Sequence, residues 1–306
     1  MAIATFAQMV EYAQSCGPVR VAVAAAAERE VLLAIAEAQQ AGIAKATLVG
    51  DVAAIRRLQA ELKLDLGHAR LVDEPEPKRA AVQVISLAAQ GEVDVVAKGQ
   101  IKTDELLSAA LRREGGIRER NLLTHVGVFE IPRMSRLIYI SDSGVVLYPD
   151  IYQKLEIIQN VVDVARCFGL EMPKVAILSA TEDVHPSMPG SIDALALSRM
   201  AQQGSIEGAV VDGPLSLDVA IEPHAAAVKG VQGPVAGQAD ILIVPNVESG
   251  NIMAKSIQYF ARGRMAGLVV GARTPILISS RADTAETRFF SMAMAALLVD
   301  GRRKGA

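Results

Sequence analysis

ILIVPNVESGNIMAKS (residues 241–256) and PILISSRADTAETRFF (residues 275–290) decide the fold of this chain. Each stretch runs from a short apolar segment through a polar loop into a segment with helical spacing, which predicts a strand, a turn and a helix. A helix N-terminus beside a strand end forms an anion site, because amide N–H groups without a helical partner point at the ligand. Two such units in one region favour a phosphate-handling enzyme.

Polar side chains stand at both loops. In the first, Gly250 and Asn251 open the helix that carries Lys255. In the second, Ser280 and Arg281 precede the closing helix. A guanidinium is a fixed two-pronged donor that matches phosphate geometry. The second loop is therefore the leading candidate for a phosphate site.

Outward from these stretches, apolar runs alternate with helical segments of 10–15 residues in the manner of βαβ units. This alternation predicts an α/β fold with parallel sheets. The runs 124–130 and 137–141, separated by IPRMSR, predict a hairpin instead. The other expected strands are 19–24, 46–49, 69–72, 94–97, 174–179, 209–212, 241–244, 267–270 and 276–278.

A length of 306 residues suits two domains. We expect a first α/β domain made of residues 1–141 plus 281–306, and an inserted second α/β domain of residues 142–280. The closing helix, expected from Asp283 to Val299, would pack back on the first domain. An insertion of this kind leaves an interdomain cleft, a common place for a ligand site.

Composition excludes several classes. The hydrophobic fraction is 51%, aromatic residues make up 4%, and the formal net charge of -3 gives no basic surplus for nucleic acid. No apolar run approaches a membrane span, and the N-terminus lacks a secretory pattern, so we expect a cytoplasmic protein. Cys16, Cys167 and the four histidines show no metal-ligand spacing, so no metal site is predicted.

Lys98 and Gly99 follow the expected strand 94–97, where ligands of open α/β sheets bind. Lys98 could meet a phosphate, and Gly99 would let the backbone approach a ligand. The same stretch also fits a plain helix start with Thr103 as N-cap.

Asp142 and Asp212 each follow a strand and suit either acid–base chemistry or turn capping. His125 suits an acid–base or hydrogen-bonding role, but a half-buried structural role is favoured. No G-x-S-x-G or G-x-G-x-x-G motif occurs, which disfavours serine nucleophiles and ordinary dinucleotide-binding dehydrogenases.

Taken together, five motifs identify a family resemblance. The chain resembles the phosphate acetyltransferase and phosphate butyryltransferase family, and its SRAD, VDGPLSLD and THVGVFE segments are more like the butyryltransferase branch. The motifs are, in order, KGQIKTDELL (98–107), NLLTHVGVFE (121–130), VDGPLSLDVAI (211–221), GPVAGQADILIVPNVESGNIMAKS (233–256) and ISSRADTAET (278–287).

The resemblance implies an isocitrate-dehydrogenase-like architecture of two α/β domains with a cleft between them. It implies an acyltransferase of the EC 2.3.1 type that moves a short-chain acyl group, butyryl or acetyl, reversibly between coenzyme A and inorganic phosphate. Acyl-CoA, phosphate and acyl phosphate would be its ligands, with coenzyme A as a substrate rather than a resident cofactor. A homodimer or higher homo-oligomer is also implied.

For the site, the resemblance implies that Ser280 and Arg281 cradle the phosphate, while Asn251 and Lys255 complete the lining. Lys98, Gly99, Thr103, Asp212 and Gly250 are the further substrate-binding candidates.

The chain departs from the acetyltransferase branch at the position of a carboxylate. That branch places an aspartate seven residues after its serine, where this chain has Thr287. Glu286 beside it, or Asp283 in the loop, could take the thiol proton instead. Tyr259 stands about where the acetyltransferases carry an arginine, so Arg262 or Arg264 could substitute.

Two alternatives remain at this point. A drifted, non-catalytic acyl-CoA or phosphate-binding protein would account for Thr287 and Tyr259. A metal-dependent dehydrogenase on the same architecture would need an aspartate cluster, which Asp142, Asp212 and Asp283 do not make convincingly.

Overall fold

The computed structural model describes residues 2–305 and divides them into two compact units. Unit 1 contains residues 2–5 and 124–265, and unit 2 contains residues 6–123 and 266–305. Both are α/β units, as the alternation of strands and helices predicts.

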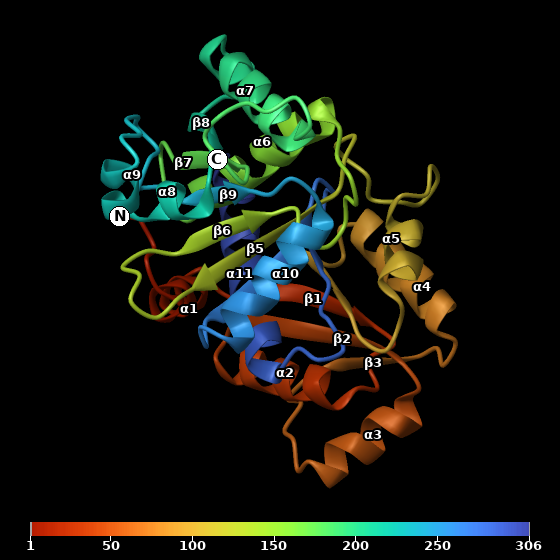
Figure 1. The fold of residues 1–306 in the computed structure, drawn as a ribbon. Helices are drawn as coiled ribbons and strands as arrows, with labels where there is room; N and C mark the ends of the chain where they lie inside the picture. Colours follow the sequence, from red (N-terminus) through yellow and green to blue (C-terminus); the bar gives the residue numbers. More distant parts are fainter. Residues whose placement is uncertain (1, 306) are drawn as a thin grey trace. The chain divides into compact units, whose positions relative to one another are not determined.

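Unit 2 is built on a sheet with the strand order β3-β2-β1-β4-β11-β10, parallel except for β10, which runs antiparallel to β11. Figure 1 shows β1, β2 and β3 side by side in this sheet. Its strands are β1 (Val19–Ala24), β2 (Ala44–Gly50), β3 (Arg70–Asp73), β4 (Val95–Lys98), most of β10 (Arg264–Val270), and β11 (Ile276–Leu277). Its helices are α1 (Phe6–Ser15), α2 (Arg29–Gln40), α3 (Val52–Glu61), α4 (Pro77–Ala89), α5 (Thr103–Ala110) and α11 (Ala285–Lys304).

The strand order of unit 2 reverses at β1. The chain moves outward from β1 through β2 to β3, then returns to place β4 on the other side of β1. Right-handed crossovers therefore put α2 and α3 on one face of the sheet and α4 on the opposite face. The carboxyl ends of β1 and β4 form the switch point at which open α/β sheets bind ligands.

Unit 1 has the strand order β5-β6-β9-β7-β8, parallel except for the β5–β6 hairpin. Its strands are β5 (Thr124–Glu130), β6 (Ile138–Ser141), β7 (Lys174–Leu178), β8 (Val210–Leu215) and β9 (Ile241–Ile243). Its helices are α6 (Ile151–Cys167), α7 (Pro189–Gln202), α8 (Leu217–Ile221), α9 (Pro223–Val228) and α10 (Val247–Tyr259).

The unit boundaries differ from the expected division at residues 142 and 280. β5 and β6 belong to unit 1, because β6 pairs with β9 in the sheet of that unit. Residues 266–280 belong to unit 2, because β11 pairs with β4. Strand pairing over long sequence distances sets both boundaries, and neither is visible in local composition.

The closing helix α11 is the central packing element of unit 2. Every residue from Arg288 to Val299 is buried, and the helix packs against α1 and α2, as expected from the sequence. Phe290 meets Phe6 of α1 with ring centroids 4.7 Å apart. The helix begins at Ala285, after the N-cap Thr284, and ends at Lys304. It therefore starts and ends later in the chain than the expected span Asp283–Val299.

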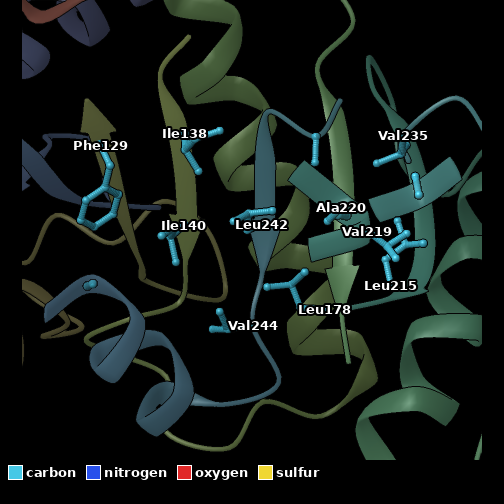
Figure 2. Close-up of a cluster of buried hydrophobic side chains, with 14 residues drawn as sticks. Phe129, Ile138, Ile140, Leu178, Leu215, Val219, Ala220, Val235, Leu242 and Val244 are labelled. Atoms are coloured by element: carbon cyan, nitrogen blue, oxygen red, sulfur yellow. The ribbon is translucent and has the colours of Figure 1, made fainter. Parts of the chain in front are cut away.

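In unit 1 the core lies between the sheet and its helices. Figure 2 shows Leu242 of β9 near the middle of this cluster, with Ile140 of β6 on one side and Leu178 of β7 on the other. Branched aliphatic residues dominate, consistent with a chain poor in aromatic residues. No helix within residues 2–305 is both long and apolar enough to cross a membrane.

Leu242→Ala tests the importance of this core. Leu242 is 2% exposed and belongs to the buried cluster, so truncation leaves a cavity between strands. We expect the free energy of unfolding to fall by about 2–5 kcal/mol. Urea unfolding followed by circular dichroism measures it. Val228→Ala, at a side chain 72% exposed, is the control and should change that energy by less than about 0.5 kcal/mol. Equal effects of the two variants would contradict the assignment.

Candidate functional site

Two strand ends of unit 2 bring the phosphate candidates to one edge of the sheet. β4 and β11 pair in parallel, with Val96 opposite Ile276 and Ala97 opposite Leu277. The chain therefore leaves the sheet at the same level after both strands, toward Lys98-Gly99 in one case and Ser279-Ser280-Arg281 in the other. Sequence positions about 180 residues apart thus become neighbours.

Lys98 is a buried cation at this edge. It is 6% exposed, and its Nζ donates to the carbonyl oxygens of Ile101 at 2.9 Å and Gly99 at 3.4 Å. Burial lowers the pKa of Lys98, because water no longer stabilises its charge. Among the charged groups that act on this pKa, Arg281 lowers it and Asp283 raises it, so both lie within electrostatic reach of Lys98.

Gly99 has a packing role that the sequence did not reveal. A Cβ at Gly99 would stand 2.3 Å from the carbonyl oxygen of Ala25, in the turn after β1. The Gly99 amide donates to Ala24 O at 2.8 Å. The glycine therefore allows close contact with the protein's own backbone rather than demonstrating contact with a ligand. Thr103 is not the N-cap of α5; that position is Lys102, whose backbone is extended.

The loop between β11 and α11 is closed by its own hydrogen bonds. The Asp283 carboxylate accepts from the Ser280 amide at 2.7 Å, and the Ser280 carbonyl accepts from the Asp283 amide at 3.1 Å. This arrangement leaves Ser280 and Arg281 exposed at the tip. The sequence placed Asp283 at the start of the helix, but the helix begins at Ala285. Asp283 instead fixes the loop that presents the two phosphate candidates.

The helix amides at α11 are already engaged. The Ala285 amide donates to Glu30 Oε2 at 2.8 Å, and the Thr287 amide donates to Thr284 Oγ1 at 3.2 Å. The expectation of unpaired amides is therefore wrong for these two groups. An anion at this loop would be held chiefly by side chains.

Arg288 was missed by the sequence analysis, and so was its partner Glu28. Arg288 is 3% exposed, and its Nη2 lies 2.5 Å from Glu28 Oε1 in the segment that follows β1. It also lies close enough to Lys98 to lower the pKa of that lysine. A charged residue at the start of the apolar run 289–299 was the available signal, since charge is rare on a buried helix unless it is paired.

The two carboxylates considered as bases lie in different surroundings. The charge of Asp283 raises the pKa of Lys98. Glu286 instead acts on Glu37 of α2, where burial and then the charge of Glu286 raise the pKa of the Glu37 carboxyl. Asp283, like Glu28, is thus a carboxylate whose charge raises the pKa of Lys98.

In unit 1 the N-terminus of α10 is capped from within the protein. Asn246 is the N-cap, and its Oδ1 accepts from the Ser249 amide at 3.0 Å in a capping box. The Gly250 amide donates to Asn246 O at 3.1 Å, so Gly250 lies inside the helix rather than opening it. The expected set of unpaired amides is wrong for these positions as well.

Gly250 permits a close approach between α10 and the loop after β6. A Cβ at this position would stand 2.6 Å from the carbonyl oxygen of Asp142 and 3.0 Å from the Cα of Ser143. Asn251 lies next to it, exposed, with its Nδ2 3.5 Å from Ser143 O. The start of α10 and the loop after β6 therefore pack directly against each other.

Asp142 is the organising side chain of that loop. Its Oδ1 accepts from the amides of Gly144 and Val145, both at 2.8 Å, while its Oδ2 accepts from the amide of His125 at 2.9 Å. It is 2% exposed. Of the two roles left open by the sequence, the geometry supports capping.

His125 is buried and lies next to Ser143, with its Nδ1 2.9 Å from Ser143 Oγ. His125 lies on β5, and Ser143 lies in the loop after β6. His125 is therefore hydrogen-bonded to another side chain of the protein.

The two remaining candidates of unit 1, Asp212 and Lys255, contact other residues. The Asp212 carboxylate accepts from the Gly213 amide at 2.8 Å and lies against Gly233 of the glycine-rich segment. Lys255, half-buried on α10, has its Nζ 3.2 Å from Gln258 Oε1. Over residues 2–305, no three His, Cys, Asp or Glu side chains are grouped so that they could hold a metal ion.

Comparisons with known proteins agree on one family. Residues 5–84 and 78–296 match the family described as "Phosphate acetyl/butaryl transferase". The chain is 40% identical over 300 residues to the phosphate butyryltransferase of Clostridium acetobutylicum, covering 98% of this chain and 100% of that protein. It is 41% identical over 267 residues to a phosphate acetyltransferase of Rhizobium meliloti, covering 87% and 84% respectively.

A solved structure supports the same fold. The crystal structure of a branched-chain phosphotransacylase from Enterococcus faecalis V583 superposes with a TM-score of 0.80 at 29% sequence identity. The match covers 92% of this chain and 99% of that protein.

Asp142→Ala tests the capping role. The change leaves three backbone amides without their acceptor, so we expect the free energy of unfolding to fall by at least about 1–3 kcal/mol. Asp142→Asn keeps one carbonyl oxygen and should lose less. Urea unfolding measures both, with Asp183→Ala on the exposed surface of unit 1 as the control. Unchanged stability in Asp142→Ala, accompanied by lost activity, would make Asp142 a catalytic group instead.

Proposed function

The chain belongs to the phosphate acetyl/butyryl transferase family, and on this premise we propose that it transfers a short-chain acyl group reversibly between coenzyme A and inorganic phosphate. The observation that carries the proposal is the cationic edge of unit 2, where the buried Lys98 lies in the field of Arg281. A desolvated cation costs stability unless an anion compensates it. A phosphate oxyanion is such a partner.

The chemistry follows from this arrangement. In one direction a phosphate oxygen attacks the thioester carbonyl, a C–O bond forms, the C–S bond breaks, and coenzyme A leaves as a thiolate that takes up a proton. In the other direction the thiolate attacks the acyl carbonyl of the acyl phosphate, a C–S bond forms, the C–O bond to phosphate breaks, and inorganic phosphate leaves. Lys98, Ser280 and Arg281 would hold the phosphoryl oxygens, and each preorganised donor typically contributes about 10²–10³ in rate.

We assign the proton-accepting role to Asp283 rather than Glu286. The thiol of coenzyme A has a reference pKa near about 8.5, so a nearby base increases the share of thiolate at neutral pH. The charge of Asp283 raises the pKa of Lys98, whereas the charge of Glu286 raises the pKa of Glu37. This contrast supports the assignment.

The other candidates are proposed substrate contacts. Asn251 and Lys255 on α10 suit the polar parts of coenzyme A or phosphate, because Asn251 is exposed and Lys255 is half-buried. Gly99, Thr103, Asp212 and Gly250 remain further proposed substrate-binding residues. Coenzyme A is treated as a substrate, with no resident cofactor or metal.

We further propose a cytoplasmic homodimer or higher homo-oligomer. Support for self-association comes from α10 and its C-cap residue, because Ile252 is 67% exposed, Tyr259 57% and the C-cap Phe260 88%. Exposed apolar side chains gathered on one element are typical of an interface. Neither alternative from the sequence, the drifted binding protein or the dehydrogenase, is favoured, because relatives that align with nearly the whole chain are named as transferases.

Arg281→Ala tests the phosphate assignment. Because Arg281 is exposed, the fold should survive while phosphate-dependent release of coenzyme A from butyryl-CoA falls about 10²–10³-fold. Release is followed with a thiol reagent at saturating acyl-CoA. Arg79→Ala, at a side chain 76% exposed in the same unit, is the control and should retain full activity. Wild-type rates in Arg281→Ala would remove Arg281 from the site.

Asp283→Asn and Glu286→Gln separate the two carboxylates. We expect Asp283→Asn to lower the rate in the thiol-consuming direction about 10²–10⁴-fold, the usual contribution of a positioned base. Glu286→Gln should change that rate less than about threefold, since Glu286 acts on Glu37. Rates are measured from butyryl phosphate and coenzyme A between pH 6 and 9. The reverse pattern would transfer the role to Glu286.

A further inference from the structure

Unpaired donors are concentrated at one place in unit 2. Within residues 2–305, the buried side-chain atoms without a hydrogen-bond partner are Tyr139 Oη, Ser279 Oγ, and Nε and Nη1 of Arg288. Ser279 directly precedes the proposed phosphate loop, and Arg288 Nη2 lies 3.5 Å from Ser280 O. Buried donors are almost always paired, so three unpaired donor atoms around one loop need an explanation.

The charges at the same place are poorly screened by water. Lys98 and Arg288 are both nearly fully buried. Arg288 is ion-paired with Glu28, while Nζ of Lys98 donates to backbone carbonyl oxygens. A negatively charged ligand would interact strongly with these two buried cations.

A small cavity lies beside the two buried cations. It is about 20 Å³ in volume and is lined by Lys98 and Arg288 together with apolar side chains such as Val23, Ile35 and Met292. This volume accommodates one water molecule or one oxygen atom of a larger ligand. Its lining is mostly apolar, and Lys98 and Arg288 are the charged residues in it.

We propose that Arg288 is a substrate-binding residue, which donates from Nε or Nη1 to an oxygen of the phosphate or acyl phosphate, with Ser279 Oγ as an additional donor. The inference rests on the proposed function for the identity of the anion. Glu28 holds the guanidinium in place through Nη2, and Nε and Nη1 are left without a protein acceptor. Arg281 at the loop tip then grips the anion from the exposed side, and Arg288 grips it from within.

The test is a set of variants at Arg288, measured with inorganic phosphate. Arg288→Met keeps the length of the side chain and removes every donor, while Arg288→Lys keeps the charge. We expect Arg288→Met to raise the KM for phosphate about 10–100-fold, the effect of losing a charge-assisted hydrogen-bonded contact. The KM for butyryl-CoA should change less than about threefold. Arg288→Lys should be intermediate, and Arg79→Met should match the wild type.

A second readout does not depend on acyl transfer. Phosphate stabilises a protein that binds it, so the thermal unfolding temperature rises with phosphate concentration. In Arg288→Met the concentration needed for a given rise should increase about tenfold or more. If Arg288→Met does not fold, Arg288→Lys and Glu28→Gln provide the same comparison, since Glu28→Gln frees the guanidinium from its anchor.

The outcomes distinguish this inference from the proposed function. Wild-type protein that binds phosphate but releases no coenzyme A would end the proposed function, while weaker phosphate binding in Arg288→Met would still support the anion contact. Unchanged phosphate KM and unchanged phosphate-dependent stabilisation in Arg288→Met would overturn the inference and leave a structural water as the occupant of the cavity. Equal rises in both KM values would overturn it too, because a general loss of structure has that signature.

Discussion

The parallel pairing of β4 between β1 and β11 is the constraint on which the rest of unit 2 depends. It brings the ends of three strands to one level, so that Lys98, the loop from Ser279 to Asp283 and the segment containing Glu28 meet at the edge of the sheet. Gly99 makes this possible, since any side chain there would collide with Ala25. The position of the cations is therefore a consequence of sheet packing, and it does not require a flexible loop to close around them.

Burial gives these cations their chemical character. Water stabilises a charged ammonium or guanidinium group, and its removal leaves each cation dependent on nearby carboxylates. Glu28 compensates Arg288 directly, and Asp283 acts on Lys98 while it also holds the loop. Donors that remain unpaired at such a site are costly for stability. That cost is typical of positions kept for a ligand, because stability and function then make opposite demands on the same residues.

The strands expected from the sequence lie within a few residues of those observed, for physical reasons that particular residues illustrate. Val95, Val96 and Ala97 form an apolar run too short for a helix, and β4 lies there. Asp142 could not be assigned between chemistry and capping, because both roles use the same residue after the same strand; three amide contacts decide for capping. Arg288 went unnoticed, since a single arginine at the start of an apolar helix resembles an ordinary N-terminal turn.

Local pattern alone was sufficient for the α/β class, the β5–β6 hairpin, and the family motifs around Asn251 and Arg281. These features depend on periodicity and on neighbours in the chain, which the sequence contains directly. The tertiary structure alone established that the amides at α10 and α11 are capped, that Glu286 acts on Glu37 while Asp283 acts on Lys98, and that Arg288 is buried beside Glu28. The capping box of α10 is a local contact between Asn246 and Ser249. The bond from the Ala285 amide to Glu30 and the surroundings of Glu286, Asp283 and Arg288 depend instead on residues distant in the chain, which strand order and helix packing bring together.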